Sequence, residues 1–144
     1  MANGTAGPVG VRGISGVGYT SATGNITFLK VTPIHCVVAI RGNQTTTITL
    51  AMLKVINETV SAPIVDIKAI WFSCLSGSGN TIVRNSVTLW DLPGVPGNYQ
   101  FDGWSDTQAR TSDITVSIGA SGGTIILELV KKGGYGDSQQ NLFI

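Results

Sequence analysis

Apolar and polar residues alternate with a period of two over most of the chain beyond residue 24. In residues 113–118, for example, Ile114, Val116 and Ile118 alternate with an aspartate, a threonine and a serine. Strict alternation of this kind predicts strands that bury one face. The same criterion predicts strong strands over residues 34–40, 48–52, 65–71, 114–118 and 125–129, and weaker strands over 26–31, 81–90 and 98–104.

Turn-forming residues separate these segments. Examples are Ser61-Ala-Pro63 and Lys132-Gly-Gly134, and such breaks recur at intervals of about 8–15 residues. One stretch, residues 50–58, is a candidate helix, but Val55, Ile56 and the threonine run before it favour a strand. We therefore expect an all-β chain that forms an antiparallel β-sandwich, either a jelly roll or immunoglobulin-like.

The first 24 residues differ in composition from the rest of the chain. They hold glycines at positions 4, 7, 10, 13, 16, 18 and 24 and almost no charge. Ordering such a segment alone in water is entropically expensive, yet its apolar residues are unlike those of a pure linker. We expect residues 1–24 to form an extended Gly-rich N-terminal arm that orders against a neighbouring subunit. The contacts are expected from Val9, Val11, Arg12, Ile14 and Val17.

The remaining chain divides into a β-sandwich domain, residues 25–135, and a C-terminal tail, residues 136–144. A chain of 144 residues can bury enough surface to fold without a metal or a disulfide. Fraying is the default for a terminus, but this tail ends in three apolar residues. Leu142, Phe143 and Ile144 are the candidate contacts to this domain or to a neighbouring subunit.

The charge content is low for a free monomer. Charged residues make up 12% of the chain, the formal net charge is +1 and the mean hydropathy is +0.27, whereas soluble domains carry about 25% charged residues. We expect part of the uncharged surface to be covered by other subunits, which can be further copies of this chain in a homo-oligomer. With so small a net charge and no long apolar run, neither nucleic acid nor membrane is an expected partner.

Few residues in the chain are suited to catalysis. His35 is the single histidine, and a residue next to it in a strand, such as Cys36, points to the opposite face. Cys36 therefore lacks a base, and we expect Cys36 and Cys74 to be buried free thiols. The spacing predicts no metal site and no cofactor, and we expect that the protein is not an enzyme.

Four aspartates lie within residues 91–113, around Trp104. Paired carboxylates serve glycoside hydrolysis, but no other part of such a site is visible. Residues 102–106 also lack the alternating oxygen ligands of a calcium loop. Trp104 is suited to stacking on a sugar, and the alternative is an aromatic residue that plugs the end of the core. Asp113 is expected at the entry of a strand.

Four blocks of the C-terminal half resemble small virion structural proteins of tailed bacteriophages, especially those of marine and cyanobacterial hosts. They are Arg84-Asn-Ser-Val-Thr-Leu-Trp-Asp-Leu, Tyr99-Gln-Phe-Asp-Gly-Trp-Ser-Asp-Thr107, Thr111-Ser-Asp-Ile-Thr-Val-Ser-Ile118 and Gly123-Thr-Ile-Ile-Leu-Glu-Leu-Val-Lys-Lys-Gly-Gly-Tyr135. The resemblance covers residues 81–135, and its motifs are strand-and-turn patterns without a catalytic signature.

The resemblance implies a capsid decoration or cement protein that binds the assembled head and stabilises it. Its partners would be the major capsid protein and neighbouring virion subunits, and its location the capsid surface after synthesis in the host cytoplasm. Extended arms that pair with a neighbour's sheet edge agree with such a role. Two alternatives remain open: a neck, tail or fibre component of the virion, and a carbohydrate-binding adhesion module.

Overall fold

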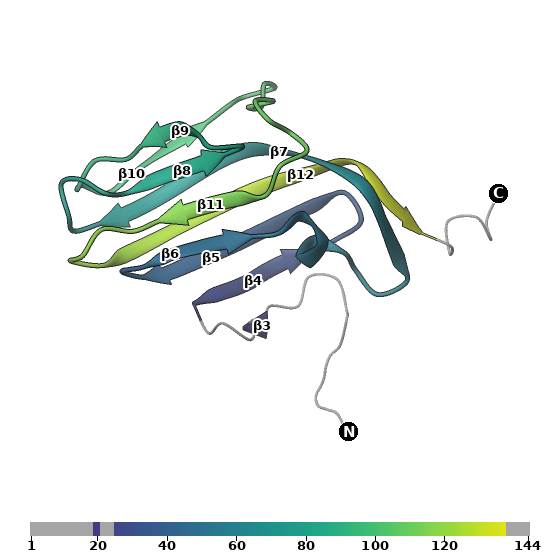
Figure 1. Ribbon diagram of the computed structural model, residues 1–144, viewed down its shortest axis with the longest axis horizontal. Coiled ribbons are helices and arrows are strands. Elements are labelled where there is room, and N and C mark those ends of the chain that lie inside the picture. The colour runs from purple at the N-terminus through teal and green to yellow at the C-terminus, as the bar shows by residue number, and fades with distance from the viewer. Residues whose placement is uncertain (1–18, 21–24, 138–144) are drawn as a thin grey trace.

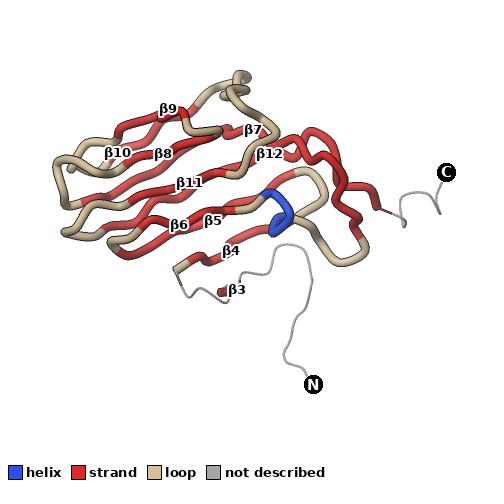
Figure 2. The backbone as a smooth tube through the Cα atoms, viewed as in Figure 1, coloured by secondary structure: helices blue, strands red, loops and turns tan. Residues whose placement is uncertain are grey.

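The computed structural model describes residues 19–20 and 25–137, which form two antiparallel sheets stacked as a sandwich (Figure 1). The predicted all-β architecture is confirmed. The described residues include one short 3-10 helix, η1 (Leu50–Leu53), between strands (Figure 2). None of them forms a helix long and apolar enough to cross a membrane.

The larger sheet has six strands in the order β10-β7-β12-β5-β4-β3. Its long central strands, β7 and β12, pair antiparallel with each other along most of their length. The bounds are β3 (Tyr19–Thr20), β4 (Ile26–Val31), β5 (His35–Gly42), β7 (Glu58–Cys74), β10 (Gly97–Gln100) and β12 (Gly123–Asp137). The smaller sheet has the order β6-β11-β8-β9, with β6 (Thr45–Ile48), β8 (Thr81–Arg84), β9 (Val87–Asp91) and β11 (Ile114–Ser117).

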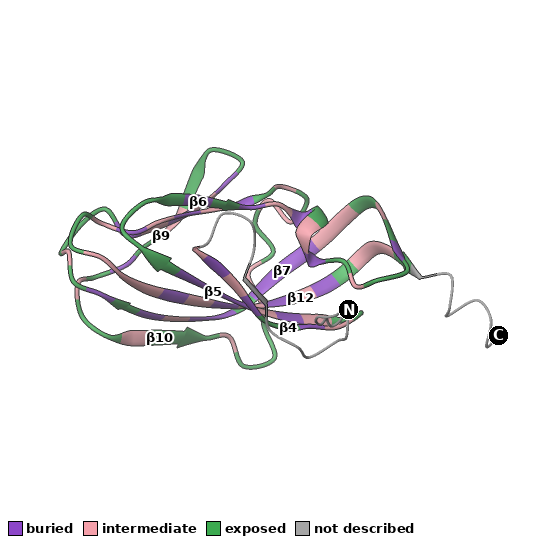
Figure 3. Cartoon of the chain, turned by 90° about the horizontal axis from the view of Figure 1, so that it is seen from below, coloured by how far each residue is buried: buried purple, intermediate pink, exposed green. Residues whose placement is uncertain are grey.

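The core lies between the two sheets and is built by the predicted alternation. Ile125 and Leu127 of β12 and Val116 of β11 are fully buried. Figure 3 shows the buried positions alternating along the strands. Burying an aliphatic side chain of this size stabilises a fold by roughly 1.5–3 kcal/mol. The inward face of each strand therefore supplies the main stabilisation, and the outward face is left for other roles.

One predicted strand, over residues 81–90, is two strands. β8 and β9 pair in an antiparallel hairpin in which Arg84 lies opposite Val87. Asn85 and Ser86 connect them with φ values of 50° and 62°. Two positive φ values are the signature of a type I′ turn, whose twist matches that of the strands. The sequence did not predict this turn, because serine stands at its second position, where glycine is the usual residue.

The predicted strand over residues 48–52 is wrong beyond Ile48. The chain leaves β6 and forms η1, so that Leu50 and Leu53 are both buried. The main-chain N–H of Leu50 donates to Asp113 Oδ1 at 2.9 Å. Asp113, expected at a strand entry, thus satisfies a free donor at the start of η1 from another part of the chain, which sequence periodicity does not reveal.

Two predicted turns, at residues 61–63 and 132–134, lie inside strands. They face each other where β7 and β12 continue as a ribbon, with register shifts on both sides of Gly133. Ala62 has φ 48° and Gly134 φ 81°. A Cβ on Gly134 would lie 2.3 Å from Pro63 Cα, so only glycine permits this close crossing. The turn-like residues build a bulge instead of ending the strands.

The first described residues form a border strand of the six-stranded sheet. β3 pairs antiparallel with β4, Tyr19 opposite Phe28 and Thr20 opposite Thr27. β3 is therefore the border strand on the β4 side of this sheet. At the other end, β12 runs past residue 135 to Asp137.

Candidate functional site

The outer face of the six-stranded sheet carries apolar side chains where a sandwich commonly carries polar ones. The register aligns Trp71 of β7, Ile126 of β12 and Ala39 of β5 across three neighbouring strands. The residues beside them, including Phe72 and Ile125, are buried in the core. Trp71 and Ile126 remain partly exposed, whereas Ala39 is fully buried. Trp71 and Ile126 are therefore the candidate contact residues of this row.

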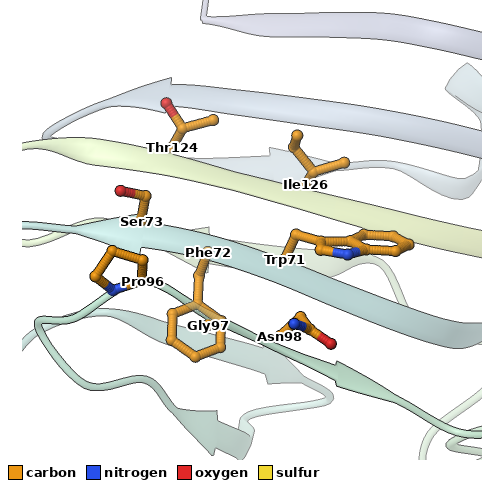
Figure 4. A pocket seen from close by; sticks show the side chains of 8 residues that line it. All are labelled: Trp71, Phe72, Ser73, Pro96, Gly97, Asn98, Thr124 and Ile126. Carbon is orange, nitrogen blue, oxygen red and sulfur yellow. The ribbon is translucent and has the colours of Figure 1, made fainter.

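A shallow hollow of about 410 Å³ opens beside the row (Figure 4). Trp71 and Ile126 line it together with Ser73 and Thr124, which face each other in register. Figure 4 shows these four side chains on one side of the sheet. Pro96, Gly97 and Asn98, at the start of β10, complete its border. We call this surface the apolar hollow.

A second depression, of about 810 Å³, lies at the other end of the same face. We call it the cationic groove: it is lined by Lys30, Thr32, Pro33, Ile34, His35, Lys68, Glu128 and Val130. Ile34 is 69% exposed there. Lys30 and Lys68 are exposed and belong to different strands, β4 and β7. The groove thus combines an apolar residue with two free ammonium groups.

His35 forms a side-chain hydrogen bond on this face. Its Nε2 lies 2.5 Å from Glu128 Oε2, and the two side chains are 22% and 20% exposed. Cys36, the next residue, is fully buried. The expected placement of His35 and Cys36 on opposite faces is confirmed, and the histidine cannot act as a base for that thiol.

The outer face of the four-stranded sheet has different chemistry. Thr45 and Ser117 hydroxyls lie 2.9 Å apart, and those of Thr47 and Thr115 lie 3.3 Å apart. Each pair joins β6 to β11 directly across the ladder. Such cross-strand hydroxyl pairs contribute modestly to sheet stability. Their hydrogen-bonding capacity is partly used within the face.

A buried ion pair fastens η1 to the larger sheet. Lys131 Nζ donates to Glu58 Oε1 at 2.6 Å, to the Leu53 carbonyl at 2.8 Å and to the Thr32 carbonyl at 3.0 Å. The two charged side chains are 1% and 0% exposed. Lys131 Nζ also lies 4.3 Å from the centre of the Tyr135 ring. All three ammonium donors are used, so this cluster is structural.

Arg84 is a second buried cation, in the smaller sheet. Its guanidinium donates to the main-chain carbonyls of Val65, Arg110 and Ser112 at 2.7–3.1 Å. Burial lowers the pKa of Arg84, and nearby Asp106 opposes this effect. Arg84 therefore holds the loop after β10 against β7, and its charge is not presented to a ligand.

Both cysteines are free and buried, as the sequence predicts. Burial raises the pKa of the Cys36 thiol to about 11, with a smaller opposing effect of Lys131. The pKa of Cys74 is also raised by burial. Since the thiolate is the nucleophile, neither thiol is activated. Among the described residues, no group of His, Cys, Asp and Glu is arranged to hold a metal ion.

The aspartate-rich segment forms an aromatic border between the two sheets. Trp90 of β9 stacks on Phe101 at 5.5 Å, and Phe101 meets the edge of Trp104 at 4.8 Å between ring centres. Trp104 is nevertheless 59% exposed. It packs on Phe101, which itself lies against the core, and presents a face to solvent. We call Trp90, Phe101 and Trp104, with the exposed Asp91 and Asp102, the aromatic edge.

The residues predicted to make subunit contacts lie outside the described residues. These are Val9, Val11, Arg12, Ile14, Val17, Leu142, Phe143 and Ile144. The outer face of the six-stranded sheet was missed by the alternation criterion. Its signal is the unbroken apolar run, as in residues 36–40 and 69–72, because a strand that is apolar on both faces loses its alternation.

The chain was also compared with known proteins. No protein-family model matches it, and no curated protein or solved structure shows significant similarity to it.

Proposed function

We propose that this protein is a non-enzymatic virion structural protein, a decoration or cement protein that binds the assembled head of a tailed bacteriophage. The proposal includes an extended Gly-rich arm on a sandwich of jelly-roll or immunoglobulin-like type. The arm and the apolar tail would reach neighbouring subunits. The resemblance of residues 81–135 to such proteins supports this role.

The observation that carries the proposal is the apolar hollow. An aromatic and an aliphatic side chain, Trp71 and Ile126, lie partly exposed on a face that is supported by the rigid β7–β12 pair. Buried aromatic anchors dominate the energy of protein interfaces. The major capsid protein is the proposed occupant of this face. Many equivalent contacts on one shell would add avidity, so each can be modest.

Co-sedimentation of the full chain with assembled phage heads tests the role. We expect saturable binding at hundreds of copies per head, counted by gel densitometry. Deletion of residues 2–24 should leave the domain folded and abolish binding if the arm is the clamp. Unchanged occupancy would overturn the arm's part in the proposal, and a few copies per intact particle would favour the neck, tail or fibre alternative.

The exposure of Trp104 favours a second candidate, carbohydrate binding at the aromatic edge. Sugar-binding sites use an exposed aromatic face, and 59% of Trp104 is exposed. A glycan array with the purified chain tests it. Loss of a specific glycan signal in Trp104→Ala, with circular dichroism unchanged, would support adhesion, and an array without any signal would contradict it.

A further inference from the structure

The charges of the two exposed patches are segregated. The cationic groove holds two ammonium groups, Lys30 and Lys68, against one carboxylate, Glu128, which is hydrogen-bonded to His35. The aromatic edge holds Asp91 and Asp102, both exposed. Among the described residues, none of these two lysines and two aspartates takes part in an ion pair. A net charge of +1 therefore conceals one positive and one negative patch.

The apolar parts of the two patches are a depression on one side and an exposed aromatic side chain on the other. The groove is an open depression of about 810 Å³ with Ile34 and Pro33 at its rim. The aromatic edge is a protruding indole, Trp104, held by its ring contact with Phe101 at 4.8 Å. A rigid aromatic side chain that loses little conformational entropy is a suitable anchor for such a depression.

The two patches border the same strand. Phe101 N–H donates to the Lys68 carbonyl at 3.2 Å, so the turn that carries Trp104 begins beside the strand that supplies Lys68 to the groove. Contiguous, mutually complementary patches allow a two-fold pair in which each subunit offers both.

We propose that a second copy of this chain occupies the cationic groove. Trp104 of each subunit inserts beside Ile34 of its partner, and Asp91 and Asp102 approach the partner's Lys30 and Lys68. Both pairings form in one dimer, with the groove of each subunit against the edge of its partner, so the contact is isologous. This inference concerns self-association and does not depend on the proposed role on a phage head.

Sedimentation velocity on the full chain over a concentration series tests the pairing. We expect a monomer–dimer equilibrium that weakens between about 0.05 and 0.5 M salt, since exposed charges are screened. Trp104→Ala should raise the dissociation constant at least ~10-fold. Leu75→Ala is the matched control, because Leu75 is 73% exposed outside both patches and should leave the equilibrium unchanged.

Charge reversal makes the test specific. Lys30→Glu with Lys68→Glu should give a monomer, and so should Asp91→Lys with Asp102→Lys, while urea unfolding shows both to be folded. Mixing the two variants should restore a heterodimer, because each edge then meets a groove of opposite sign. A wild type that stays monomeric at about 1 mM in low salt, or a mixture that does not associate, would overturn the proposal.

Discussion

The outer faces of the two sheets present different surfaces to a partner. The six-stranded sheet presents Trp71 and Ile126 beside a hollow, whereas the four-stranded sheet presents hydroxyl pairs such as Thr45 with Ser117. Apolar surface gains free energy on contact with a partner, and hydroxyls that bond one another gain less. The comparison favours the six-stranded sheet as the side that would bind a partner in the proposed role.

The sheets also differ in how they hold a buried cation. Lys131 in β12 donates to a carboxylate, Glu58, at 2.6 Å and also to two main-chain carbonyls, whereas the hydrogen bonds of Arg84 in β8 all go to main-chain carbonyls. A side-chain partner can be removed by substitution and a main-chain partner cannot. The two sites therefore respond differently to paired substitutions.

The largest expected effect is on stability at the ion pair. Lys131→Met leaves Glu58 buried without its cation, which typically costs about 3–5 kcal/mol. Urea unfolding at pH 7 measures the loss. Adding Glu58→Leu should recover part of the loss, because an apolar pair replaces an orphaned charge. The recovery is incomplete, because the carbonyls of Thr32 and Leu53 have lost their ammonium donor and the Val55 N–H has lost its acceptor.

Arg84→Met is the matched change in the other sheet. It removes the guanidinium donor from the carbonyls of Val65, Arg110 and Ser112, of which the Arg110 carbonyl still accepts from the Val65 N–H. No substitution of a partner side chain can compensate for the loss, because the partners are main-chain groups. Rescue of Arg84→Met by Asp106→Asn, or no rescue of Lys131→Met by Glu58→Leu, would contradict this difference between the sheets.

The next effect concerns the outer faces. Trp71→Ala should weaken head binding by about 30-fold, the cost of roughly 2 kcal/mol expected of an aromatic anchor. Thr115→Ala, on the hydroxyl face, should leave the affinity unchanged. Co-sedimentation isotherms compare the two variants, and equal losses in both would remove the distinction between the faces.

A pH effect of the order of 2 kcal/mol is expected from the six-stranded sheet. Burial raises the pKa of Cys36 to about 11, above its value in the unfolded chain. Burial of the neutral Cys36 thiol contributes stability that is fully present below about pH 8.5. This contribution is lost as the pH rises from there through the folded pKa of about 11. Unfolding free energies measured between pH 8 and 11 should fall less steeply in Cys36→Ala. Identical slopes in the two proteins would argue against this burial effect.

The smallest effect is expected beside Arg84. Burial raises the pKa of Asp106, and its Oδ2 has no hydrogen-bond partner within the described part of the chain. Stability is therefore present while Asp106 is protonated and is lost as the pH rises through its folded pKa. Asp106→Asn should gain up to ~1 kcal/mol at pH 7 and nothing at pH 3. Asp102→Asn, an exposed control, should change stability at neither pH.

Alternation alone predicted most of the strands, because the inward residues of β11 and β12 are consistently aliphatic. It failed where the cause lies elsewhere in the chain. Asp113 stabilises the start of η1 from 63 positions away, and Pro63 and Gly134 form a bulge only because they face each other. Sequence distance hides both effects.

The candidate site was less predictable than the fold. In the sequence, Trp71 and Ile126 are indistinguishable from other strand residues. Only the strand register of the structure shows that they lie side by side on the outer face. The cationic groove is assembled from β4, β5, β7 and β12, and no local motif joins Lys30 to Lys68. By contrast, the separation of His35 from Cys36 follows from their adjacency in a strand, and was predictable.

The most direct test of the binding side is thiol footprinting on decorated heads. Ser73 and Thr47 are both exposed, one on each outer face, and the native thiols are buried. Maleimide labelling of Ser73→Cys and Thr47→Cys is compared free in solution and bound to heads. The account predicts at least ~10-fold protection of Ser73→Cys on heads and an unchanged rate for Thr47→Cys. Protection of Thr47→Cys with Ser73→Cys still reactive would contradict it.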